Sequence, residues 1–117
     1  MRLNEIDFPD ARPIDGYGPG FFRVGGEVHQ GPLLVSGGAP HAWSGLEDEA
    51  ALTALVDRVD VLFVGMGGDI AHLPAALRDT LEEAGLGVEV MSTPAACRTY
   101  NVLLSEGRRV ALAALPV

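Results

Sequence analysis

The chain is poor in several residue types, and each shortage excludes a class of protein. It has a single cysteine, Cys97, so no internal disulfide can form and a reducing compartment is expected. Its apolar runs, such as 61–64 and 111–117, are much shorter than the roughly 20 residues that cross a bilayer. The acidic start, residues 1–13, lacks the apolar core of a secretory signal. We therefore expect a cytoplasmic protein with no membrane insertion.

Positive charge is also scarce. The 8 basic residues are all arginines and stand against 16 acidic residues, which gives a formal net charge of -8. Such a charge repels phosphate backbones, and no basic patch is visible in the sequence, so a nucleic-acid partner is not expected. Hydrophobic residues, by contrast, make up 48% of the chain, which is enough for a core. Residues 1–117 are predicted to form a single α/β domain.

The first part of the chain predicts β-structure. Residues 1–20 are rich in glycine, proline and aspartate and indicate an irregular lead-in. Segments 21–24 and 27–30 flank Gly25 and Gly26, a pattern typical of a hairpin because glycine tolerates the positive φ of a tight turn. A further strand is predicted at 33–36. The hairpin is expected to form an extra layer at the amino-terminal end.

The rest of the chain alternates helical and strand patterns. Helices are predicted at about 46–57, from Pro74 to the residue before Gly85, and from Thr93 to about Glu106, with strands at 61–65, 88–91 and 109–115. Ser44 and Glu47 have the spacing of a capping box, and Thr93 followed by proline is typical of an N-cap. Helices alternating with apolar strands predict a central, largely parallel sheet flanked by helices.

A candidate binding site is predicted at the start of the third helix. Arg98 and Asn101 lie one turn apart there, on the arc opposite the apolar face. Helix starts attract anions, and α/β folds bind ligands where parallel strands end, which is also where the glycine loop 65–69 leaves its strand. The candidate residues for a small anionic ligand are therefore Gly65, Gly67, Gly68, Asp69, Thr93, Arg98 and Asn101.

Structural roles for the same residues stay open. Arg98 has Glu89, Asp69 and Glu106 as alternative ion-pair partners, and Asn101 has the alternative role of fixing a loop. The glycine loop lacks the spacing of nucleotide-binding motifs, so no cofactor is expected.

Catalytic and metal sites are not predicted either. Cys97 falls on the apolar arc of its helix, which predicts a buried structural thiol. The histidines show no metal-ligand spacing. With no catalytic residues and no metal site predicted, a binding protein is expected rather than an enzyme.

Residues 89–115, EVMSTPAACRTYNVLLSEGRRVALAAL, resemble the Mth938-like domain family. The most specific match is the stretch A-x-R-T-Y-N, from Ala96 to Asn101. A Gly-Tyr-Gly lead-in, a Gly-Phe hairpin, Trp43 and the Gly65-x-Gly67 loop also fit the family pattern. Ser92 departs from it, because many members are acidic at this position.

The resemblance implies a three-layer α/β fold with a mixed central sheet whose last strand is antiparallel. The family includes a mitochondrial protein that assists the assembly of respiratory complex I, and an adipogenesis-associated relative. The resemblance thus implies a non-catalytic binding or assembly role with a protein partner, linked to complex I biogenesis. The alternative function is a small-molecule binder or enzyme that uses Arg98 and the 65–69 loop. The oligomeric state is not predicted.

Overall fold

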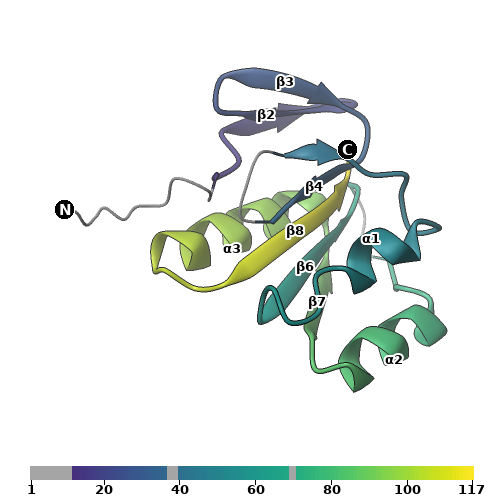
Figure 1. Cartoon of the computed structure of the whole chain (residues 1–117). Helices are drawn as coiled ribbons and strands as arrows, with labels where there is room; N and C mark the ends of the chain where they lie inside the picture. Colours follow the sequence, from purple (N-terminus) through teal and green to yellow (C-terminus); the bar gives the residue numbers. More distant parts are fainter. Residues whose placement is uncertain (1–11, 37–39, 69–70) are drawn as a thin grey trace.

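The computed structural model describes residues 12–36, 40–68 and 71–117 and contains two β-sheets (Figure 1). The larger sheet has the strand order β5-β4-β8-β6-β7 and is formed by Leu33–Val35 (β4), His41–Ala42 (β5), Val61–Met66 (β6), Gly87–Met91 (β7) and Val110–Leu115 (β8). The smaller sheet is antiparallel and is formed by Gly16–Gly18 (β1), Phe21–Val24 (β2) and Glu27–Gln30 (β3).

The larger sheet is mixed, as the resemblance implies. Strand β6 pairs in parallel with β7 and β8, whereas β4 pairs antiparallel with β5 and β8. The implied antiparallel last strand needs a correction, because β8 is antiparallel only to β4 and runs parallel to β6. The reason is the connection through α3 (Thr93–Ser105): a helical crossover returns the chain to the end of the sheet where β7 began, so β8 must run in the same direction.

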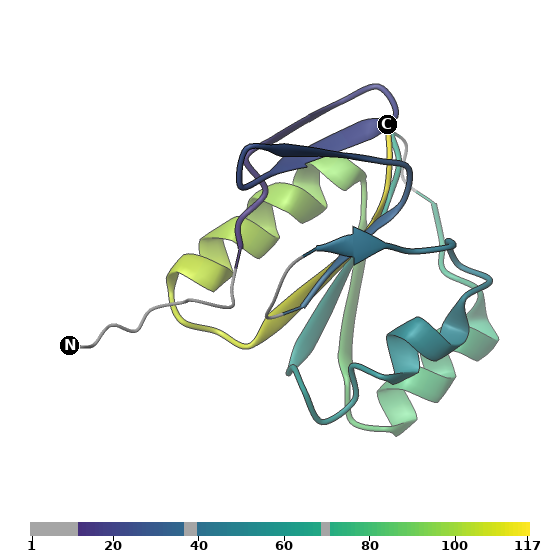
Figure 2. The ribbon, with the colours of Figure 1, turned by 45° about the horizontal axis from the view of Figure 1, so that its top comes forward.

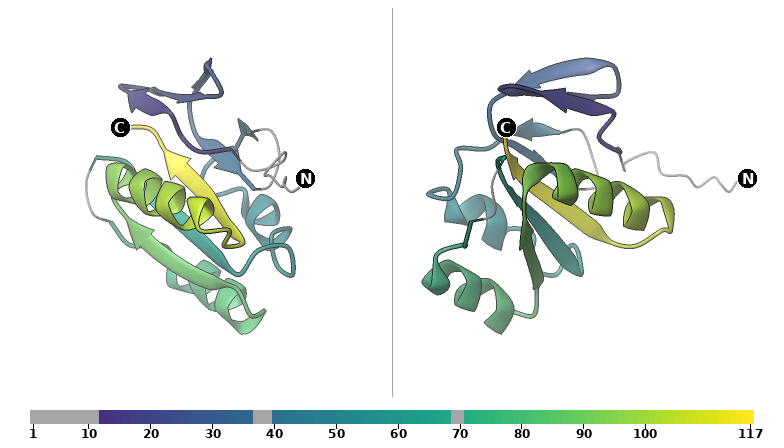
Figure 3. Two further views of the ribbon diagram at one scale, coloured as in Figure 1. Left: turned by 90° about the vertical axis from the view of Figure 1, so that its left-hand side faces the viewer. Right: turned by 180° about the vertical axis from the view of Figure 1, so that it is seen from behind.

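Helices and the smaller sheet cover the two faces of the larger sheet. Helices α1 (Glu49–Thr53) and α2 (Ala75–Glu83) lie on one face, and α3 lies on the other together with β1, β2 and β3 (Figures 1, 2 and 3). Leu62 and Val64 of β6 pack in the core on the side of α1 and α2, whereas Phe63 packs in the core on the side of α3. The continuous apolar run of β6 is thus buried on both sides, as expected of a central strand. The predicted three-layer α/β fold with an amino-terminal β-layer is confirmed.

Three local predictions in the first half are wrong. Helix α1 is only five residues long, and its N-cap is Asp48, whose carboxylate accepts a hydrogen bond from the Ala51 N–H, rather than Ser44. Gly16–Gly18, predicted as irregular, pairs with β2, and the short strand His41–Ala42 was not predicted. The apolar spacing that predicted a longer helix reflects buried side chains. After Thr53 the backbone continues as turns rather than as α-helix, and Asp57 has a φ of 71°.

The ends of the later helices follow the proline and glycine signals more closely. Helix α2 has Pro74 at its N-cap, and Gly85, with a φ of 97°, comes directly after its C-cap. The N-cap of helix α3 is Ser92, one residue before the predicted N-cap Thr93, and Ser92 makes no side-chain capping bond. Thr93 is instead the first helical residue, and its hydroxyl forms hydrogen bonds inside the molecule.

Candidate functional site

The predicted site begins where β6 ends and α3 starts. The Gly67 N–H donates to Thr93 Oγ1 (2.8 Å), and the Thr93 N–H donates to the Gly67 carbonyl (2.8 Å). The Thr93 hydroxyl in turn donates to the Leu115 carbonyl at the end of β8 (2.6 Å). The Thr93 side chain is fully buried. One hydroxyl therefore joins the ends of β6, α3 and β8, and we call this contact the Thr93 junction.

Glycine is required at the junction because two backbones approach closely. A Cβ built on Gly65 would lie 2.7 Å from Thr93 Oγ1 and 2.9 Å from Thr93 Cα. Gly67 has a φ of 87°, which residues with a side chain rarely adopt. Gly68 is exposed, and Asp69 lies outside the described residues. The structure thus brings Gly65, Gly67 and Thr93 together as hydrogen-bonded, packed backbone.

Arg98 and Asn101 lie farther along α3 and line a different hollow. It has a volume of about 240 Å³, and its lining, within the described ranges, contains no residue of the 65–68 loop; it is formed by Ile14, Asp15, Gly16, Tyr17, Pro94, Cys97, Arg98 and Asn101. Asp15 lines the same hollow as Arg98, and its negative charge opposes the binding of an anion there. Arg98 is exposed and forms no ion pair with Glu89 or Glu106. An anion site at Arg98 stays a prediction.

The polar side chains of the Tyr100–Asn101 pair hold the segment that leads into β1. Asn101 Oδ1 accepts from the Ile14 N–H and Asn101 Nδ2 donates to the Ile14 carbonyl, both at 2.8 Å. The Tyr100 hydroxyl donates to the Arg12 carbonyl (2.9 Å), and burial raises the pKa of Tyr100. The contacts of Asn101 therefore match its alternative predicted role, which was to fix a loop.

The Cys97 thiol is buried, as its position on the apolar arc predicts. Burial raises the pKa of Cys97 from 9.0 to about 11. A thiol that ionises less readily in the folded protein favours folding below pH 9, and this contribution is lost as the pH rises toward 11.

We expect alkylation of native Cys97 by iodoacetamide at pH 8 to be about a hundredfold slower than in the unfolded chain, because only the thiolate reacts. Rates measured in buffer and in urea check this. Equal rates in the two conditions would show that the thiol is accessible and ionised.

The described residues contain neither a candidate metal site nor a candidate membrane span. No three histidine, cysteine or acidic side chains gather there in a way that could hold a metal ion. Among the helices of residues 12–36, 40–68 and 71–117, none has the length and apolar character needed to cross a membrane.

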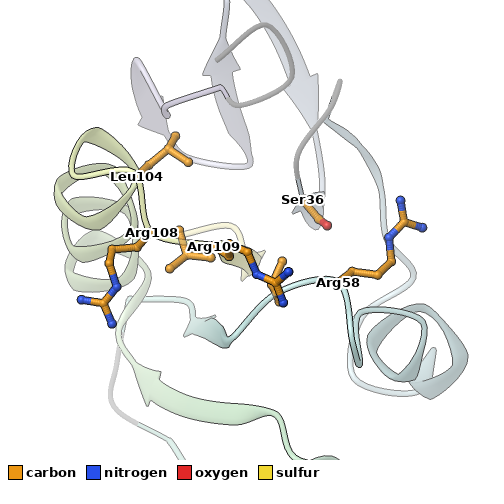
Figure 4. Close-up of a pocket in the computed structure, with 7 residues that line it drawn as sticks. Ser36, Arg58, Leu104, Arg108 and Arg109 are labelled. Atoms are coloured by element: carbon orange, nitrogen blue, oxygen red, sulfur yellow. The ribbon is translucent and has the colours of Figure 1, made fainter. Parts of the chain in front are cut away.

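A second hollow, which was not predicted from the sequence, lies at the opposite end of the larger sheet. It has a volume of about 260 Å³ and lies between the end of β4, the loop before β6, the end of α3 and the start of β8 (Figure 4). Three arginines line it, Arg58, Arg108 and Arg109. The adjacent pair Arg108 and Arg109 was the only signal in the sequence. Arg58 joins them because β6 and β8 pair in parallel, which places the residues before both strands at the same end.

A family model described as "Protein of unknown function (DUF498/DUF598)" matches residues 14–115. The chain belongs to this family. The match covers both sheets, the Thr93 junction and the two hollows. The predicted membership in the Mth938-like domain family is confirmed, because the solution structure of a Bordetella pertussis protein described as a Mth938-like domain superposes with a TM-score of 0.78. That protein is 26% identical, with 99% of this chain and 92% of the other covered.

Two relatives of this DUF498/DUF598 member are similar in sequence. An uncharacterized protein of Rhodobacter capsulatus is 56% identical over 117 residues, with 100% of this chain and 94% of that protein covered. NADH dehydrogenase (ubiquinone) 1 alpha subcomplex assembly factor 3 of Danio rerio is 33% identical, with 88% of this chain and 63% of that protein covered. The chain therefore spans less than two thirds of the length of the Danio rerio protein.

Proposed function

We propose that this chain is an assembly factor that acts by binding protein partners, and that the complex it serves is a respiratory NADH dehydrogenase. The observation that carries the proposal is the 33% identity with assembly factor 3 of Danio rerio over 88% of this chain. The homology supports an assembly role, and the particular complex and a cytoplasmic location are part of the proposal.

The internal contacts of four side chains of α3 also support a binding role. The side chains of Thr93, Tyr100 and Asn101 form hydrogen bonds with the chain's own backbone. Cys97 is held as a neutral thiol at physiological pH by burial. These four side chains therefore stabilise the fold. We infer that the protein binds its partners through its exposed surfaces.

Deletion of the gene in its host tests the proposal. The amount of assembled NADH dehydrogenase, measured on native gels and by NADH oxidation in isolated membranes, is expected to fall and to recover when the intact gene is returned. A second membrane enzyme, such as succinate dehydrogenase, serves as the control and should keep its activity. A normal amount of assembled NADH dehydrogenase in the deletion strain would contradict the proposal.

A further inference from the structure

The hollow lined by Arg58, Arg108 and Arg109, here called the arginine hollow, concentrates positive charge on an acidic protein. It holds three of the chain's 8 basic residues, although the whole chain has a net charge of -8. Arg109 pairs with Asp60 (3.2 Å), and both side chains are about 60% exposed (59% and 62%), so solvent weakens this pair. Arg58 and Arg108 form no ion pair with a residue that the structure describes.

This charge distribution is suited to an acidic partner. Most of the protein repels a negatively charged molecule, whereas the arginine hollow attracts it. Complementary charge of this kind steers a partner to one face and suppresses other encounters.

The three guanidinium groups are spread around the hollow. Figure 4 shows Arg58 on one side of the hollow and Arg108 on the opposite side, beside α3, with Arg109 between them. A single small anion is bound best when donors converge on one point in an enclosed site. Arginines set apart from one another fit several carboxylates along an extended chain.

The apolar part of the lining points to a protein as the source of these carboxylates. Val59, Leu104 and Val110 form it and are 8%, 8% and 3% exposed. Arginines around a small apolar floor are typical of protein interfaces, where arginine is enriched. A nucleic acid would need a longer basic track to overcome the net charge of -8.

We propose that the arginine hollow docks an acidic segment of a protein partner. The proposal deepens the assembly role and rests on it, because the partner is a protein that the factor helps to assemble. The carboxylates of the segment pair with Arg58 and Arg108, and its apolar groups rest on Val59 and Leu104.

Peptide binding to the purified full chain tests the proposal. The probe is a fluorescein-labelled peptide of alternating glutamate and serine, and its matched control has glutamine in place of glutamate. By fluorescence anisotropy at low ionic strength, the glutamate peptide is expected to bind about tenfold more tightly than the glutamine peptide. Added salt should remove the difference.

Charge-neutral variants locate the site. We expect Arg58→Gln with Arg108→Gln to weaken binding of the glutamate peptide about tenfold. Arg23→Gln is the matched control, because Arg23 is also exposed but lies on β2, outside this hollow, and it should leave binding unchanged. All these side chains are exposed, so the variants are expected to fold, which circular dichroism verifies.

Several results would overturn the proposal. These are an absence of glutamate-peptide binding by the wild type, equal binding by the double variant, or an equal loss in Arg23→Gln. Displacement of the peptide by inorganic phosphate or oligothymidylate beyond the effect of matched ionic strength would assign the hollow to a small anion or to nucleic acid. The assay contains no NADH dehydrogenase subunit. A failed gene deletion test with arginine-dependent peptide binding would therefore reject the assembly role alone, and the reverse pair of results would reject the docking site alone.

Discussion

Replacement of Thr93 by valine is expected to lower the free energy of unfolding by about 2–4 kcal/mol, because it removes a hydroxyl that makes one buried and one partly buried hydrogen bond. The Gly67 N–H would lose its acceptor and the Leu115 carbonyl would lose its donor. Valine keeps the shape of the side chain, so the loss reports the two unsatisfied backbone groups rather than a cavity. Urea unfolding followed by circular dichroism measures it.

Thr93→Ser is the matched control. Serine keeps the hydroxyl and gives up one methyl group, so the expected cost is about 1 kcal/mol. If valine destabilises the protein no more than serine does, the two hydrogen bonds of the Thr93 junction together contribute no more than the packing of one methyl group.

Gly65→Ala is expected to cost about 1–3 kcal/mol, because the added methyl group would overpack a site that has no room for it. The new Cβ would lie 2.9 Å from Thr93 Cα, which is backbone and cannot rotate away. Strand β6 is paired on both sides, with β7 and β8, so it cannot shift without disturbing the sheet. Thermal and urea unfolding of the variant measure the loss.

Gly68→Ala is the control for this substitution. A Cβ on Gly68 would meet nothing within 4 Å, so the free energy of unfolding should change by no more than about 0.5 kcal/mol. Equal stability of the two alanine variants would mean that the junction opens readily and that close packing at Gly65 does not hold β6 to α3. In a double-mutant cycle, Gly65→Ala and Thr93→Ser should be non-additive, because the two residues are in contact.

The elements from residue 61 onward were predicted well because their signals are local. Apolar runs specify β6 and β8, and proline and glycine mark the ends of α2 and α3. The apolar arc of α3 correctly predicted that Cys97 is buried. Helix α1 was predicted too long, because apolar spacing records which side chains are buried and not whether the backbone between them stays helical.

The candidate site was less predictable, because its contacts join distant segments. The sequence placed Thr93 at a helix start, where a hydroxyl usually caps its own helix. The fold turned that hydroxyl toward Gly67 and Leu115, 26 and 22 residues away. Asn101 was proposed as a binding residue from its place on the helix, yet its amide binds the backbone of Ile14, 87 residues away. Residue type and position on a helix could not reveal these partners.

The sequence by itself determined the α/β class, most of the helices and strands, the core face of α3 and the family. These follow from periodicity, turn residues and motifs that act within a few neighbouring positions. Only the tertiary structure decided the direction of β8 relative to its two neighbours, the closure of the glycine loop on Thr93 and the gathering of Arg58 with Arg108 and Arg109. Those outcomes depend on the strand order and on the crossover connections. These bring together residues that are far apart in the sequence, and no local pattern indicates that they will meet.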